Sequence, residues 1–264
     1  MNTACNGCRN GLGLDFGFTM AFQPIVDLAA GRVWGYEALV RGLDGEGAGH
    51  VLSKVTDETR YVFDQAARVK AIEMAGAMLP GDDTKLSINF MPNAVYEPRA
   101  CIRASLEAAR RVGLDRTRLM FEFTENERMA DIGHVQKIVD EYRKIGFTTA
   151  LDDFGAGYAG LNLLAHFRPD LIKIDMELVR DIDREPAKQI IVSGIIAIAQ
   201  ALSVTVLAEG VETETEARVL LAAGIPLQQG YYFGKPQQER LPAVDGLDIF
   251  ADRPAPRTPD RVAA

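Results

Sequence analysis

Residues 19–40 have the sequence TMAFQPIVDLAAGRVWGYEALV, in which two apolar runs, 19–28 and 33–40, flank the four residues AAGR. Both runs are rich in β-branched and aromatic residues and therefore predict β-strands. A four-residue connection suits a hairpin, whereas a parallel crossover needs about a dozen residues or more. One of these two strands is therefore expected to run antiparallel to the rest of its sheet.

Beyond this pair, the chain alternates between predicted strands and predicted helices. The further strands are expected at Leu86–Met91, Leu119–Thr124, Thr148–Asp152, Leu171–Met176, Val204–Glu209 and Ile225–Phe233. The gaps between them carry apolar residues at helical spacing, as in 62–79 and 135–145. Gly113, Gly146 and Gly224 follow such stretches, where a left-handed helix cap is favoured. Thr213 and Glu216 have the spacing of a capping box.

This alternation defines the predicted fold class, which is α/β. Eight strands in a chain of 264 residues fit a modified TIM (β/α)8 barrel with one antiparallel strand. A doubly wound open sheet is the alternative. The apolar stretch 190–208 is interrupted by Ser193, Gln200, Ser203 and Thr205, so it predicts a buried helix followed by a strand rather than a membrane span.

The composition is that of a globular protein, with 47% apolar and 25% charged residues. The net charge of −8 argues against DNA, RNA or an anionic membrane as a partner bound through bulk charge. Three cysteines are too few for a disulfide framework and fit a reducing compartment. Residues 1–18 contain Asp15 and lack the apolar core of a secretory signal. A cytoplasmic protein is therefore expected.

The chain is expected to divide into a flexible segment at 1–17, one catalytic domain at 18–250 and a disordered tail at 251–264. The tail is polar and rich in proline. Cys5 and Cys8 have CxxC spacing, but no second pair accompanies them, which favours a flexible segment over a zinc or redox site.

Polar residues interrupt or end the apolar strands, one or two per strand. They are Glu37, Asn89, Glu122, Asp152, Asp153, Lys173, Glu209 and Gln229. From Asn89 onward, successive strands supply them 20 to 36 residues apart, about the length of one βα unit. Each residue alone is most simply a solvated rim position. Together they are expected to meet at the C-terminal mouth of a barrel, where such folds place their chemistry.

Five carboxylates and one lysine give this cluster a formal charge of −5 + 1 = −4. Such a cluster cannot remain ionised without compensating cations. Oxygen donors without His or Cys favour Mg²⁺ or Mn²⁺ over Zn²⁺. The number of ligands, with Asp152 and Asp153 adjacent, favours two ions, an arrangement typical of phosphoester hydrolysis. The glycine-rich residues 154–157 would open the strand so that both carboxylates serve one site.

The order of these motifs resembles the EAL-domain phosphodiesterases that hydrolyse cyclic di-GMP. The resemblance covers about residues 18–236. Its motifs are Glu37-Ala38-Leu39 with Arg41, Glu122 to Glu125, Asp152-Asp153-Phe154-Gly155, Lys173-Ile174-Asp175, Glu209 to Glu212 and Gln229-Gly230-Tyr231. Two elements depart from the family. Residues 89–92 are NFMP where the family commonly has NLSP, and 152–161 are DDFGAGYAGL where it commonly has DDFGTGYSSL.

The resemblance implies hydrolysis of one phosphodiester of cyclic di-GMP to linear pGpG with two Mg²⁺ or Mn²⁺ ions, Ca²⁺ being inhibitory. It implies that Glu37, Asn89, Glu122 and Asp152 hold one ion and that Asp152, Asp153 and Glu209 hold the other. Catalytic roles fall to these ligands, above all Glu37, Asp152 and Glu209, and to Lys173, which positions the attacking water or neutralises charge. Glu209 is also a candidate proton acceptor. Substrate contacts are assigned to Arg41, Gln23, Gln229 and Asp175, and Glu125 would anchor the loop after Asp153.

Alternatives remain open at this level. The chain could be a catalytically silent cyclic di-GMP receptor or a protein-interaction module, as some relatives are. An unrelated possibility is a metal-dependent barrel that acts on a carboxylate substrate with Lys173 as base. The resemblance also implies a homodimer, to which the apolar residues 190–202 would contribute. Any regulation would act through a protein partner, through dimerisation or through a further domain.

Overall fold

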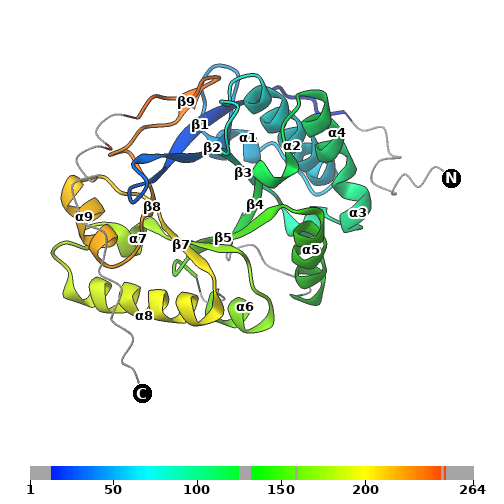
Figure 1. Cartoon of the computed structure of the whole chain (residues 1–264). Helices are drawn as coiled ribbons and strands as arrows, with labels where there is room; N and C mark the ends of the chain where they lie inside the picture. The colour runs from blue at the N-terminus through cyan, green and yellow to red at the C-terminus, as the bar shows by residue number, and fades with distance from the viewer. Residues whose placement is uncertain (1–12, 125–131, 158–159, 245–246, 248–264) are drawn as a thin grey trace.

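The structure, a computed structural model, describes residues 13–124, 132–157, 160–244 and 247. These residues form a barrel of strands surrounded by helices (Figure 1). The strands are β1 (Thr19–Asp27), β2 (Arg32–Arg41), β3 (Lys85–Asn89), β4 (Leu119–Thr124), β5 (Thr148–Phe154), β6 (Leu171–Ile174), β7 (Thr205–Ala208), β8 (Leu227–Gln229) and β9 (Gln237–Gln238).

The helices lie on the outer face of the barrel (Figure 1). The α-helices are α1 (Ala48–Leu52), α2 (Arg60–Gly76), α3 (Pro98–Cys101), α4 (Arg103–Arg111), α5 (Ile132–Ile145), α6 (Gly160–His166), α7 (Met176–Val179), α8 (Pro186–Leu202) and α9 (Glu214–Ala222). Short 3-10 turns, Pro92–Ala94 and Arg116–Arg118, lie after β3 and before β4. The expected helix caps are present, with positive φ at Gly113, Gly146 and Gly224 and a capping box between Thr213 and Glu216.

The sheet closes on itself in the order β2-β3-β4-β5-β6-β7-β8-β1, with β1 also paired to β2. The strand β1 runs antiparallel to both β2 and β8, and the pairings from β2 round to β8 are parallel. The predicted modified barrel with one antiparallel strand is therefore confirmed, and β1 is that strand. The alternative of an open sheet is wrong. The short strand β9 pairs with β1 outside the barrel.

Several predicted strand boundaries are wrong because the strands end earlier than expected, at polar turns or helix caps. The strand expected to run to Phe233 ends at Gln229, since residues 230–233 form a turn. Asp175 is not in a strand but caps α7, where its Oδ1 accepts a hydrogen bond from the Glu177 N–H at 2.8 Å. The helix expected to be buried at 190–202 is buried along one face only, with Ile190 73% exposed. Among the described residues, no helix is both long and apolar enough to cross a membrane.

A small apolar layer fills the interior of the barrel. It consists of Ile25, Met120, Ala150, Leu171, Leu207 and Leu227, with Trp34 packed against it. Five of these six residues lie two positions before a polar residue of the sequence motifs, and Ile25 lies two positions after Gln23 because β1 runs the other way. Since alternate residues of a strand share one face, the polar side chains form the next layer up. The apolar layer is thus the floor of the candidate site.

The loops that follow β7 and β8 are hydrogen-bonded to each other around Gly230. Val211 donates a backbone hydrogen bond to the carbonyl of Gln229 at 3.1 Å, and Tyr232 donates one to the carbonyl of Val211 at 3.0 Å. A Cβ atom added to Gly230 would lie 2.0 Å from the backbone oxygen of Val211. Only glycine therefore permits this approach between the segments that follow Glu209 and Gln229.

Gly230→Ala is expected to lower the free energy of unfolding by about 2 kcal/mol or more, because the backbone of both loops must separate. A thermal melt measures the loss. The matched control is Gly194→Ala on α8, where an added Cβ meets nothing within 4 Å. That change should keep or raise the melting temperature, since alanine is favoured over glycine inside a helix. Equal melting temperatures for the two variants would contradict the clash.

Candidate active site

The C-terminal ends of the strands bring the predicted polar residues together inside the barrel mouth. Glu37 pairs in register with Ser87 and Asn89 with Glu122, so these neighbouring strands present their side chains at matching heights. Lys173 pairs with Leu207, two residues before Glu209. Glu122 and Lys173 are fully buried, and Glu37 and Asp152 nearly so. Residues more than 170 positions apart in the sequence thereby form one site.

Lys173 lies at the centre of this site. Its Nζ atom is 2.6 Å from Glu209 Oε1, 3.1 Å from Asp152 Oδ1, 3.2 Å from Glu122 Oε2 and 3.6 Å from Glu37 Oε2. Burial disfavours the ammonium, yet the four carboxylates raise the pKa of Lys173 well above its usual value. One positive charge thus faces four carboxyl groups.

The carboxyl groups form two overlapping trios with the spacing of metal ligands. Glu37, Glu122 and Asp152 make one trio, and Asp152, Asp153 and Glu209 make the other. Within each trio the candidate ligand atoms lie within 4.8 Å of one another. Asp152 belongs to both, so the two potential cation positions would be adjacent.

A β-bulge explains how the neighbouring residues Asp152 and Asp153 serve one site. The pairing of β5 with β6 shifts between Leu151 and Phe154. Asp153 has φ of 55°, a left-handed conformation that non-glycine residues rarely adopt. Bulges of this kind redirect side chains and recur next to active sites. The sequence predicted that the strand opens into a loop at 154–157, whereas the structure continues β5 to Phe154 and places the irregularity inside the strand, at Asp152 and Asp153.

Burial and mutual repulsion control the protonation of the acidic groups. Burial, and after it the charge of Glu37, raises the pKa of Glu122 well above its usual value. Burial and Asp152 do the same for Glu209, and they raise the pKa of Asp153 to about 6. The pKa of Glu37 is lowered, because Lys173 and hydrogen bonds outweigh its burial. The cluster therefore favours added cations or protons.

Amide and hydroxyl groups hold the carboxylates in place. Asn89 Nδ2 donates to Glu37 Oε1 at 3.0 Å and to Glu122 Oε1 at 2.9 Å. Gln229 Nε2 donates to Glu37 Oε2 at 2.7 Å and to Gln23 Oε1 at 3.3 Å. Ser87, which the sequence analysis missed, donates its hydroxyl to Glu122 Oε2. Its position two residues before Asn89 on β3 was the signal that could have found it.

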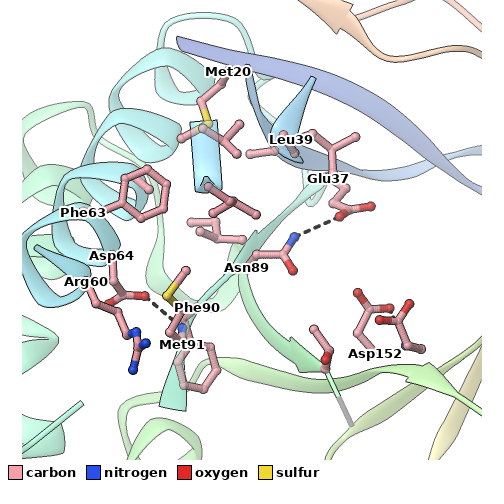
Figure 2. A pocket seen from close by; sticks show the side chains of 18 of the residues that line it. Met20, Glu37, Leu39, Arg60, Phe63, Asp64, Asn89, Phe90, Met91 and Asp152 are labelled. Atoms are coloured by element: carbon pink, nitrogen blue, oxygen red, sulfur yellow. Dashed lines mark hydrogen bonds between the residues drawn. The ribbon is translucent and has the colours of Figure 1, made fainter. Parts of the chain in front are cut away.

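Two cavities open beside the acidic cluster. The larger, of about 750 Å³, extends from Glu37, Asn89 and Asp152 between β2, β3 and α2, where Phe63 and Met91 line it (Figure 2). The smaller, of about 450 Å³, extends over the loops after β6, β7 and β8, and its lining residues include Gln23, Asp175, Glu209, Gln229 and Tyr231. Three predicted substrate-contacting residues, Gln23, Gln229 and Asp175, thus face the second cavity.

Two other predicted site residues, Arg41 and Glu125, are not shown in contact with the acidic cluster. Arg41 ends β2 on the same strand face as Glu37, and its Nη1 atom donates to the carbonyl of Val40 at 2.8 Å. No contact of Arg41 with the acidic cluster is seen among the described residues. Glu125, predicted to anchor the loop after Asp153, lies outside the described residues, as do Cys5, Cys8 and the tail beyond 247.

A further acidic trio, at Asp181, Asp183 and Glu216, shares no residue with the cluster around Lys173. Glu216 is already engaged, since its carboxylate accepts hydrogen bonds from the backbone N–H groups of Asp181, Glu212 and Thr213. Glu216 thereby joins the start of α9 to the connection after α7.

The fold and the site define the class of this protein as a (β/α)8 barrel whose C-terminal mouth holds two adjacent, metal-competent acidic groups around a buried lysine. The family model of the EAL domain matches residues 10–236. The chain belongs to the EAL-domain family.

Solved structures support this assignment across almost the whole chain. A standalone EAL protein from Vibrio cholerae O395, solved with bound c-di-GMP, is 50% identical and has a TM-score of 0.86, with 91% of this chain and 100% of that one covered. A manganese and cyclic di-GMP complex of Klebsiella pneumoniae BlrP1 is 37% identical with a TM-score of 0.78, covering 84% of this chain and 56% of that one.

Among curated proteins, the antirepressor BluF of Escherichia coli, which is regulated by blue light and temperature, is 31% identical over 224 residues, or 85% of this chain and 55% of BluF. The cyclic di-GMP phosphodiesterase PA2567 of Pseudomonas aeruginosa is 28% identical over 240 residues, or 89% of this chain and 41% of PA2567. The chain thus spans about half the length or less of these curated relatives.

Proposed function

We propose that this protein hydrolyses one phosphodiester bond of cyclic di-GMP to give linear pGpG. The observation that carries the proposal is the pair of acidic trios that share Asp152 around the buried Lys173. The Vibrio cholerae relative that binds c-di-GMP and the phosphodiesterase PA2567 support the choice of substrate and reaction.

The residues present fit two divalent cations. The donors are carboxylates and one carboxamide, which suit Mg²⁺ or Mn²⁺. Burial and the neighbouring carboxylates raise the pKa values of Glu122, Glu209 and Asp153, and bound divalent cations would offset the repulsion between these groups. Glu37, Asn89, Glu122 and Asp152 would hold one ion, and Asp152, Asp153 and Glu209 would hold the other. When bound, such ions supply a water of lowered pKa and stabilise the charge that develops on the phosphoryl oxygens.

The side chains of the chain itself would orient the reaction. The water oxygen forms the new bond to phosphorus, and the bond from phosphorus to one ribose O3′ breaks. Glu209 would accept one proton of the water and pass it on to solvent, and O3′ would take up one proton from solvent as it leaves, so the product is linear with a 5′-phosphate and a free 3′-hydroxyl. Lys173, 2.6 Å from Glu209 Oε1, would fix that carboxylate and offset negative charge. Arg41 would bind a phosphate, while Gln23, Gln229 and Asp175 would contact substrate from the second cavity.

Turnover is expected to require added Mg²⁺ or Mn²⁺, to stop in EDTA and to be inhibited by Ca²⁺. The measurement is the release of pGpG by chromatography, beside a titration of cyclic di-GMP binding in Ca²⁺. Product formation that persists in EDTA would contradict the two-cation mechanism. Tight binding without product in any metal would replace the phosphodiesterase with a receptor, and absence of both would favour a protein-interaction module.

Three further expectations accompany this proposal: a homodimer, a cytoplasmic location and regulation by a protein partner. A homodimer to which residues 190–202 contribute predicts twice the monomer mass by light scattering, and the exposed Ile190 on α8 is available for such a contact. We also expect the protein to be cytoplasmic, and its low cysteine content supports this expectation. Regulation by a protein partner would be sought by comparing turnover with and without the partner.

A further inference from the structure

A buried ion pair outside the barrel lies behind the metal-ligand candidate Asn89. Asp64 and Arg68 are one helical turn apart on α2, with Asp64 Oδ2 at 2.6 Å from Arg68 Nη2. Arg68 is fully buried and Asp64 is 3% exposed. Arg68 also donates through Nη1 to the hydroxyl of Tyr142 on α5, at 3.3 Å. Neither residue belongs to the acidic cluster of the barrel mouth.

The second oxygen of Asp64 reaches the segment that leaves β3. Asp64 Oδ1 accepts a hydrogen bond from the backbone N–H of Met91 at 2.9 Å, and Figure 2 shows this bond beside the one between Asn89 and Glu37. The backbone N–H of Phe90 still donates to the carbonyl of Glu122, at 2.9 Å. The N–H of Met91 lies beyond the strand pairing in a partly buried segment, and a backbone donor shielded from water needs a partner.

The same segment is held on its other side by aromatic packing. Phe90 is buried, with its ring centroid 5.5 Å from that of Phe123 and 5.5 Å from that of Tyr142. Because side chains alternate along a strand, Phe90 points away from the barrel interior while Asn89 points into it. Fixing Phe90 and Met91 from outside therefore fixes the direction of the Asn89 carboxamide inside.

A contribution to stability does not by itself explain why the ion pair of Asp64 and Arg68 is buried here. Two charges lose their hydration on burial, and replacing a buried ion pair by apolar residues of similar volume is often neutral or stabilising. A specific acceptor for Met91 is something that apolar residues cannot supply. The guanidinium of Arg68 in turn provides the positive charge that keeps a buried carboxylate available as that acceptor.

We propose that Asp64, with Arg68 behind it, is a positioning residue that sets the orientation of Asn89 by holding the backbone at Met91. The proposal rests on the proposed function for its effect on turnover. Its structural part, the hydrogen bond to the Met91 N–H, is independent of that function.

Two double variants distinguish the effect of losing the hydrogen-bond acceptor at position 64 from the effect of losing the charges of Asp64 and Arg68. Both Asp64→Leu/Arg68→Met and Asp64→Asn/Arg68→Met remove the two buried charges together, but only the second keeps a side-chain oxygen for Met91. We expect the leucine variant to lose about 10- to 100-fold in kcat, the size seen when an outer partner of a metal ligand is removed. The asparagine variant should recover most of that loss. Binding of cyclic di-GMP in Ca²⁺ should change less than threefold in either variant, so the loss lies in kcat rather than in KM.

Amide hydrogen exchange in the absence of substrate and metal gives a second readout. In the wild type, the Met91 amide is expected to exchange as slowly as the amides of β3. In the leucine variant, exchange at Met91 should be at least ten times faster than in the wild type, whereas in the asparagine variant it should stay slow. Equal kcat in the two variants, or fast exchange at Met91 in the wild type, would overturn the proposal. If the wild type forms no pGpG, the proposed function fails, and the exchange at Met91 still decides the positioning role. If the leucine variant does not fold, the wild-type exchange rate and the asparagine variant decide it.

Discussion

Replacing Lys173 with methionine is expected to lower kcat for cyclic di-GMP by about 10³-fold or more and to make stability depend on divalent cations. The ammonium is the positive group that lies among Glu37, Glu122, Asp152 and Glu209, all within 3.6 Å of it. Losing one member of a buried charge cluster costs about 3–5 kcal/mol, because the remaining charges are uncompensated. The rate loss follows from removing a preorganised charge and the group that fixes Glu209.

Thermal melts in EDTA and in Mn²⁺, together with initial rates of pGpG release, measure both effects. The melting temperature of Lys173→Met in EDTA should fall by roughly 10 °C for a chain of this size, and saturating Mn²⁺ should recover most of it. Lys144→Met is the matched control, because Lys144 is exposed on α5 and its Nζ atom lies 3.8 Å from a single carboxylate. The control should match the wild type in both measurements. Turnover of Lys173→Met within tenfold of the wild type would exclude the assigned role.

Local signals in the sequence predicted the features that depend on periodicity. Glu122, Lys173 and Glu209 stand out because each interrupts an apolar strand, and a parallel barrel brings strand ends together by its topology. The four-residue link at 29–32 predicted the antiparallel hairpin for the same reason, since a turn of that length leaves few choices.

Other features depend on contacts between distant segments and leave little local trace. The strand β9 is two glutamines long, so no apolar pattern marks it. Lys173 alternates with Ile172 and Ile174 as a solvent-facing residue would, and its complete burial follows only from the closure of the barrel around it. Asp64 and Arg68 resemble an ordinary surface pair at helical spacing, and their burial against the segment after β3 is set by tertiary packing.

Replacing Asp152, the carboxylate shared by the two acidic trios, is expected to lower activity without lowering the stability of the metal-free protein. Asp152→Asn is expected to lower kcat by about 10³-fold or more, because the variant removes a charged ligand from both trios at once. Stability of the metal-free protein should be kept or raised. The Asp152 charge adds to the raised pKa of both Glu122 and Glu209, so its removal relieves repulsion inside a buried site.

The test compares initial rates of pGpG release, the Mn²⁺ concentration needed for half-maximal rate, and melting temperatures in EDTA. Asp181→Asn is the matched control, since it makes the same charge change in an acidic trio that shares no residue with the cluster around Lys173. It should leave the rate within twofold of the wild type. A melting temperature of Asp152→Asn several degrees below the wild type in EDTA would mean that Asp152 is chiefly a structural partner of Lys173, whose Nζ lies 3.1 Å away. A stable variant that binds Mn²⁺ more weakly and turns over slowly would instead show that the chain keeps a destabilising carboxylate for its chemistry.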